Sequence, residues 1–200
     1  MFDWEFFEKI FWFIRIPILL VLYFVSSSKK QLVYFLALLF YQFASVFFTL
    51  SFTDFFALAS ICSLFFKICL CFLVFDLITQ QTKIAVFVAI IPFFVLYLYL
   101  VDFVDNSLGD AYYIWILNTF CTSLIGGVAI INYVNNSDKK GYWLLISAIL
   151  FVVQIGAFFI NKFYVKNEAI YQIVILAYGI SHFTFYKFLL LKEKSSVSTN

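Results

Sequence analysis

Charged side chains are scarce in this sequence of 200 residues. Asp, Glu, Lys and Arg make up 12% of it, about half of their share in an ordinary globular protein. The net charge of +2 is too small to suggest a nucleic-acid partner. Hydrophobic residues reach 65%, and Phe alone contributes 30 residues. Because a soluble domain of this size could not bury so much apolar surface, the composition predicts an integral membrane protein.

Metal-binding residue types are also few. The sequence has a single histidine, His182, which excludes a metal site built from several histidines. Its four cysteines lie in apolar runs, without the CxxC or Cys/His spacing of a zinc site. We therefore expect buried thiols rather than disulfides, with neither a metal nor a cofactor.

Long apolar runs define the fold class. A helix needs about 20 apolar residues to cross a bilayer, and continuous runs without polar alternation favour helices over a barrel. The sequence predicts an all-α, polytopic helical bundle, with residues 1–191 as one transmembrane domain and residues 192–200 as a disordered cytoplasmic tail. The predicted spans are residues 9–27, 31–50, 55–78, 84–101, 111–133, 142–160 and 169–190.

Lysines predict the direction of the bundle. Those that follow odd-numbered runs are Lys29, Lys30, Lys83, Lys139, Lys140, Lys192 and Lys194. The other side holds Lys9, Lys162 and Lys166 together with the acids Asp3, Glu5, Glu8, Asp54, Asp102, Asp105, Asp110 and Glu168. By the positive-inside rule, we expect an outside N-terminus and a cytoplasmic C-terminus. Short loops and lysine-rich turns are compatible with a bacterial inner membrane.

Lys67 is an unusual residue for an apolar run, because a charged side chain here lies near the centre of the third predicted span. Its side chain is shorter than the roughly 15 Å to the bilayer surface, and a charge at this depth costs on the order of 2.5–3.5 kcal/mol. We expect Lys67 to face the bundle interior, a water-filled cavity or a lipid headgroup drawn inward. The alternative is an amine that burial keeps neutral.

Other polar side chains occur at similar depth and predict a shared intramembrane pocket with Lys67. They are Gln42, Ser45, Asn118, Thr122, Gln154 and His182. The alternative is a set of separate hydrogen bonds between helices, each worth about 0.6 kcal/mol. For His182 alone, an interhelical hydrogen bond is the favoured interpretation. No run has a carboxylate at its centre.

Further residues in the runs are interpreted as packing residues. The small residues Thr119, Ser123 and Gly127 recur every four positions and favour close helix approach. Trp12, Trp115 and Trp143 lie toward run ends, where we expect them to anchor the bundle at the membrane interface.

Several segments resemble the YhhN family of lysoplasmalogenase-like membrane proteins. ALLFYQFASVFFTL (37–50) resembles a family helix in which Gly-Asp stands where this chain has Ala44 and Ser45. FFALASICSLFFKICLCF (55–72) is similar to a helix with a histidine at the position of Lys67. ILFVVQIGAFFINKFY (149–164) keeps the Asn-Lys-Phe of the family but has Gln154 and Ile155 in place of Ser-Asp.

Two more segments extend the resemblance. LAYGISHFTFYKFL (176–189) resembles the closing family helix, with Tyr178 retained and His182 in place of Gln. RIPILLVLYF, with Pro17, resembles a helix that contains Lys-Pro in the family. The family usually has eight spans, and by this resemblance we expect the one before the Pro17 helix to be missing.

The resemblance implies hydrolysis of the vinyl ether of a lysoplasmalogen, which requires an acid to protonate carbon and a negative group beside the oxocarbenium ion. The two aspartates of the family suit these roles, but this chain has Ser45 and Ile155 there. Lys67 would repel a cationic intermediate. We therefore expect a catalytically altered protein that binds a membrane lipid or lysolipid-like amphiphile. An active hydrolase that uses other residues and a small carrier stay open.

Overall fold

The computed structural model describes the backbone of residues 4–50 and 52–197 and the side chains of residues 13–50 and 55–195. The side chains of Asp3, Glu5, Glu8, Lys9, Trp12 and Asp54 lie outside the described residues. The described chain is all-α, as predicted. Its long helices are α1 (Trp4–Ser26), α2 (Leu32–Leu50), α3 (Phe52–Phe75), α4 (Lys83–Asp102), α6 (Tyr112–Asn136), α7 (Lys139–Phe159) and α8 (Glu168–Val197).

Short elements complete the chain where α4 meets α6 and where α7 meets α8. They are α5 (Asp105–Leu108), the 3-10 turn Gly109–Ala111 and the π-helical turn Ile160–Tyr164. Six helical segments in the described residues are long and apolar enough to cross a membrane, and Phe13–Ser26 of α1 forms a shorter apolar helix. These lengths confirm a polytopic membrane protein. The predicted span 9–27 begins among residues whose side chains are not described.

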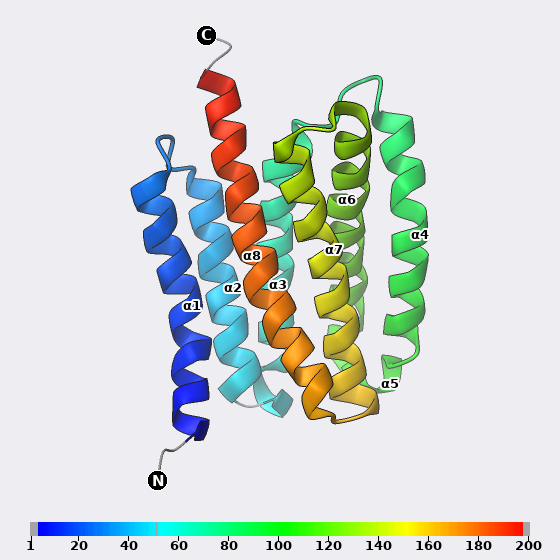
Figure 1. Ribbon diagram of the computed structural model, residues 1–200. Coiled ribbons are helices and arrows are strands. Elements are labelled where there is room, and N and C mark those ends of the chain that lie inside the picture. Colours follow the sequence, from blue (N-terminus) through cyan, green and yellow to red (C-terminus); the bar gives the residue numbers. More distant parts are fainter. Residues whose placement is uncertain (1–3, 51, 198–200) are drawn as a thin grey trace.

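The long helices run roughly side by side, with the N-terminus and the C-terminus at opposite ends of the bundle (Figure 1). The α1–α2, α3–α4 and α6–α7 connections meet at the C-terminal end, which we call the lysine-rich end because it carries Lys29, Lys83 and Lys139. The opposite end is called the N-terminal end. The positive-inside rule predicts that the lysine-rich end faces the cytoplasm.

Helix α8 extends beyond the predicted end of the bundle at residue 191. The sequence predicted a disordered tail from residue 192, whereas residues 192–197 are helical. Lys192 Nζ lies 2.6 Å from both Asp76 Oδ1 and the Leu73 carbonyl oxygen, and Ser27 Oγ donates to Glu193 Oε1 at 2.7 Å. Because these contacts join the end of α8 to α3 and α1, the last turns are held by tertiary structure. Residues 198–200 lie outside the described chain.

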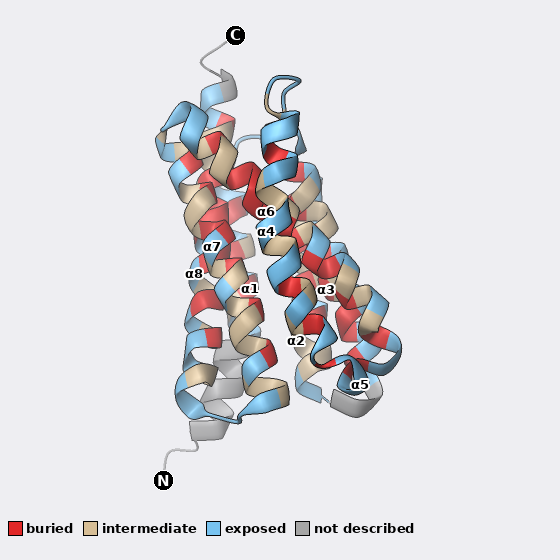
Figure 2. Cartoon of the chain, turned by 90° about the vertical axis from the view of Figure 1, so that its right-hand side faces the viewer, coloured by how far each residue is buried: buried red, intermediate tan, exposed pale blue. Residues whose placement is uncertain are grey.

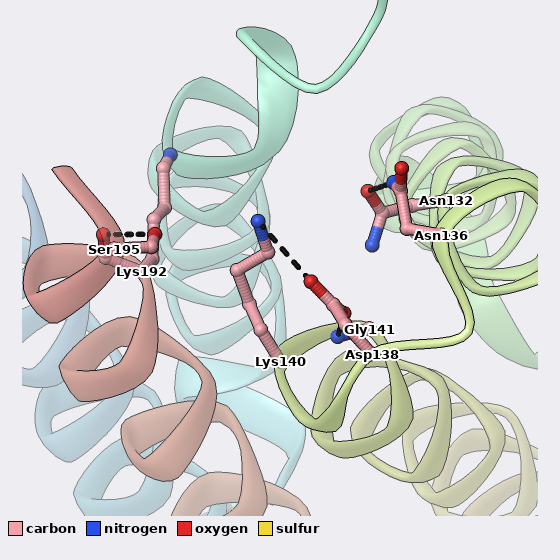
Figure 3. Close-up of polar contacts among 7 residues, drawn as sticks. All are labelled: Asn132, Asn136, Asp138, Lys140, Gly141, Lys192 and Ser195. Atoms are coloured by element: carbon pink, nitrogen blue, oxygen red, sulfur yellow. Dashed lines mark hydrogen bonds and ion pairs between the residues drawn. The ribbon is translucent and has the colours of Figure 1, made fainter. Parts of the chain in front are cut away.

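The turn between α6 and α7 shows how local sequence ends one helix and begins the next. Ser137 adopts a left-handed conformation with φ 48°, which ends α6. Asp138 caps α7, because its Oδ1 accepts the backbone N–H of Gly141 at 2.6 Å (Figure 3). Its other oxygen lies 3.6 Å from Lys140 Nζ.

Burial follows a membrane pattern, with apolar side chains on both the inner and outer faces. Exposed residues line the outward faces of the helices and buried ones face inward (Figure 2). The exposed side includes large apolar residues such as Phe72, Ile84 and Phe87. A lipid environment accepts such faces without cost, since acyl chains are as apolar as the side chains themselves.

Two helix pairs frame the functional region. Helix α2 packs along α3, and α7 packs along α8, while α6 contacts α3, α4 and α7. The predicted close approach of small residues is confirmed at Gly127, where an added Cβ would lie 2.8 Å from Ile90 Cγ1. Helix α1 covers the side between α2 and α8.

Candidate functional site

A cavity of about 710 Å³ lies between the α2–α3 pair and the α7–α8 pair, with α6 at its back. Its lining residues extend from the N-terminal end of the bundle inward to Lys67 on α3. Its volume falls in the roughly 300–1,000 Å³ range of small-molecule sites. We call it the central cavity.

Helix α2 lines the central cavity with one face. Tyr41, Ala44, Ser45 and Phe48 are spaced by three and four residues, so they project to the same side of a helix. Since α2 runs toward the N-terminal end, Tyr41 lies deepest and Phe48 lies closer to the entrance. The opposite wall repeats this order, from Gln154 and Phe158 on α7 to Asn161 in the π-helical turn that follows.

Lys67 is nearly inaccessible, with 4% of its surface exposed, and it lines the deep end of the cavity. Its Nζ lies 3.7 Å from the ring centroid of Phe151 and 5.2 Å from that of Phe66. Among the described side chains, no carboxylate forms an ion pair with Lys67. It therefore faces the bundle interior, which is one of the positions predicted from the sequence.

Hydrogen bonds fix the other polar groups of the deep end. Gln154 Nε2 donates to Tyr41 Oη at 3.0 Å and joins α7 to α2 across the cavity. Asn118 Nδ2 donates to Ser63 Oγ at 2.9 Å and joins α6 to α3. Ser63 lines the cavity, whereas Asn118 is not among the lining residues. Asn118 thus supports the wall from behind.

His182 lies next to the cavity in an aromatic layer and is not among the lining residues. Its ring centroid is 4.3 Å from that of Tyr41, 5.1 Å from that of Tyr178 and 5.2 Å from that of Phe66. Within residues 13–50 and 55–195, Nε2 of His182 has no hydrogen-bond partner. Nε2 therefore does not supply the predicted interhelical hydrogen bond within these residues, and the ring packs against aromatic neighbours. This layer closes the deep end toward the lysine-rich end of the bundle.

The structure brings together only part of the predicted polar set. Ser45, Lys67 and Gln154 share the cavity, and Asn118 and His182 lie directly behind its walls. Gln42 is half-buried on another side of α2, and its buried Oε1 has no partner among the described residues. Thr122 donates to the Asn118 carbonyl oxygen within α6 at 2.9 Å instead of reaching the cavity.

Trp115 corrects a sequence interpretation. It was expected to be an interfacial anchor, but it is 3% exposed and lines the cavity. Its ring centroid lies 6.0 Å from that of Phe158, which in turn lies 5.5 Å from that of Phe48. These three rings from α6, α7 and α2 form an aromatic girdle midway along the cavity. Trp143 is half-buried at the lysine-rich end. It is the other tryptophan that was expected at the interface and whose side chain is described.

Sequence reasoning missed the entrance of the cavity, which we call the rim. It consists of Asn161 and Lys162 in the π-helical turn after α7, Lys166 and Asn167 in the connection that follows, and Glu168 at the start of α8. The signal that could have found it is the concentration of lysine and asparagine in a single short connection. Among the described residues, the cavity lining holds three lysines and one carboxylate, so this part of the lining is positively charged.

Glu168 is too distant to act at the deep end. It is exposed at the rim and accepts a hydrogen bond from Gln172 Nε2 at 2.7 Å. Lys67 lies fifteen residues into α3, which corresponds to roughly 20 Å from the N-terminal end at 1.5 Å per residue. An acid that protonates a substrate carbon beside Lys67 is therefore not available from Glu168.

Comparisons with known proteins do not assign the chain to a family. No protein-family model, no curated protein and no solved structure matches it.

Proposed function

We propose that this membrane protein binds a single-chain, anionic, lysolipid-like amphiphile in the central cavity and does not hydrolyse it. The observation that carries the proposal is the cavity itself. It has a volume of about 710 Å³, opens at the N-terminal end and leads to the buried Lys67, which has no carboxylate partner within the described part of the chain. Short loops and lysine-rich turns fit a bacterial cytoplasmic membrane, with the cavity entrance on the outer side.

The aromatic girdle suits one acyl chain. Phe48, Trp115 and Phe158 present flat apolar surfaces at the middle of the cavity. A chain in a bilayer is already in an apolar medium, so its transfer to these walls contributes little affinity. Selection must therefore come from the polar groups at the ends of the cavity.

The charges of the lining favour an anion. In the described part of the lining, Lys67, Lys162 and Lys166 outnumber the acid Glu168. Attraction between a lysine and an anionic headgroup is stronger in this partly desolvated cavity than in water, because the effective dielectric constant is lower. A zwitterionic or cationic amphiphile gains less from the same lining.

The resemblance to the YhhN family supports a shared site with altered chemistry. Ser45 and Ile155, which stand where the family has aspartates, both line the cavity that contains Lys67. Neither side chain can donate a proton to carbon at an adequate rate. Purified protein supplied with lysoplasmalogen should release no aldehyde, whereas robust release would favour the alternative of an active hydrolase.

Binding is tested by blocking the cavity. Ala44 is 2% exposed and lines the cavity, so Ala44→Trp should fill it and abolish the lipid that co-purifies in native mass spectrometry. The matched control is Leu36→Trp on the same helix, because Leu36 is 38% exposed and lies outside the cavity lining. An unchanged lipid profile in Ala44→Trp would contradict the proposal.

A carrier is a second candidate, and one observation favours it. The cavity lining reaches the rim at the N-terminal end, whereas the described lining residues do not continue past Tyr41 and Lys67 toward the lysine-rich end, where the ring of His182 packs on Tyr41. A site open on one side and sealed on the other is what one state of a transporter requires. Flux of a bound amphiphile across proteoliposomes would establish this function, since a pure binder produces none.

A further inference from the structure

The lining of the central cavity changes from polar to aromatic and back to polar along its length. The rim is polar and holds Lys162 and Lys166. The girdle of Phe48, Trp115 and Phe158 is aromatic, and the deep end is polar again around Lys67. A ligand with one headgroup and a plain acyl chain matches only one polar end, so its methyl terminus would meet polar groups at the other.

Within residues 13–50 and 55–195, Lys67 has no carboxylate partner, and an anionic ligand could take that position. A charge at this depth costs on the order of 2.5–3.5 kcal/mol on membrane-insertion scales. The ring of Phe151 at 3.7 Å offsets part of this cost by a cation–π contact. The described carboxylates leave the ammonium unpaired, so an anionic group of the ligand would remove the remaining cost.

Ser63 adds a second donor beside Lys67. The two residues are four positions apart on α3, and side chains at that spacing lie on one face of a helix. Because Asn118 Nδ2 donates to Ser63 Oγ at 2.9 Å, the hydroxyl proton of Ser63 is directed elsewhere. No acceptor for that proton is found among the described residues. A carboxylate at Lys67 could accept both hydrogen bonds.

The two cationic ends of the cavity are separated by a fixed distance. Lys67 Nζ lies over Phe151 on α7, and Lys162 follows Phe151 by eleven residues. At 1.5 Å per residue, the rim is roughly 16 Å from the deep end. An extended chain advances roughly 1.2 Å per bond, so roughly 13 bonds cover this distance.

We propose that the ligand is two-headed: a single apolar chain with an anionic group at each end, one bound by Lys67 and Ser63 and the other by Lys162 and Lys166. This inference rests on the proposed amphiphile-binding function and specifies its ligand class. The aromatic girdle contacts the middle of the chain. Either a dicarboxylate or a chain that ends in a carboxylate and a phosphate has this chemistry.

The experiment compares chains that differ only at their far end. The probes are tetradecanedioate, its monomethyl ester and tetradecanoate, and the readout is the affinity of the purified full-length protein in a non-ionic detergent. We expect the dianion to bind about tenfold more tightly than either monoanion, which is the equivalent of one additional ion contact. A series of dicarboxylates should show its best affinity near the length that joins both ends of the cavity.

Two variants locate the second contact. In Lys67→Met the dianion should fall to the affinity of the monoanions, while Lys67→Arg should keep most of the difference because its charge is retained. Equal affinity of all three probes for the unmodified protein would overturn the two-headed ligand and leave amphiphile binding intact. Failure of every probe to bind would instead overturn the proposed function. The length series needs no variant, so a misfolded substitution cannot hide the result.

Discussion

Replacing Lys67 with methionine should stabilise the ligand-free protein even though it weakens ligand binding. Methionine has a similar length and no charge, so the substitution removes the cost of the buried ammonium, which is about 2.5–3.5 kcal/mol. It also removes the cation–π contact with Phe151, where Nζ is 3.7 Å from the ring centroid. That contact is worth about 0.5–2 kcal/mol. The difference between the two ranges is about 0.5–3 kcal/mol, and their midpoints give an expected net gain in the free energy of unfolding of about 1.8 kcal/mol.

The measurement is thermal unfolding of the purified, delipidated protein in detergent. For a chain of this length, each kcal/mol shifts Tm by about 2–4 °C, so Lys67→Met should raise Tm by about 4–7 °C. Lys83→Met is the matched control, because Lys83 is exposed at the start of α4. An exposed substitution usually changes stability by about 0.5 kcal/mol or less.

A lower Tm for Lys67→Met would refute the reasoning. It would mean that the ammonium is compensated within the protein and does not need an anionic ligand. Both the anion preference of the cavity and the two-headed ligand would then lose their physical basis. Added anionic amphiphile should also raise the Tm of the unmodified protein and leave that of Lys67→Met nearly constant.

Further substitutions test the packing and the anchoring of the helices. Gly127→Ala should lower stability by about 1–3 kcal/mol, because its Cβ would lie 2.8 Å from Ile90 Cγ1. The control Gly156→Ala should not lower stability, because no atom lies within 4 Å of an added Cβ there. Differential scanning fluorimetry compares the unfolding temperatures of the two variants. Ser27→Ala should cost about 1.5–3 kcal/mol, since Ser27 Oγ donates to the buried Glu193 carboxylate at 2.7 Å. Chemical unfolding should show this loss, and an unchanged midpoint would mean that the contact does not anchor α1 to α8.

The membrane class followed from composition, because a chain with 65% hydrophobic residues and 12% charged residues cannot hide its apolar surface in water. The spans were also predictable, since the length of an apolar run sets the length of a helix that crosses a bilayer. The C-terminal end of α8 was not predictable from the apolar run, because the helix continues beyond it. Its last turns are polar, and their order depends on the contacts of Lys192 and Glu193 with α3 and α1.

The partners of each polar side chain were not predictable in the same way. Depth along a run identified Lys67, Ser45 and Gln154 together, and these three share the cavity. The same depth also selected Gln42, which lies one residue from Tyr41 but projects about 100° away from it around the helix axis. The sequence gives the position of a residue along the helix axis. Whether that residue lines the cavity depends instead on the direction in which its side chain projects around that axis.

The sequence by itself determined the membrane environment, the helical class and the presence of a lysine at mid-depth, where a charge costs free energy. These features depend on composition and on distance along the chain. Only the tertiary structure decided that Trp115 lines a cavity, that Lys67 contacts aromatic rings and none of the described carboxylates, and that the α7–α8 connection forms the rim. The physical reason is that these features depend on which faces of α2, α3, α6, α7 and α8 are turned toward one another. Apolar faces of nearly equal hydrophobicity carry little information about that choice.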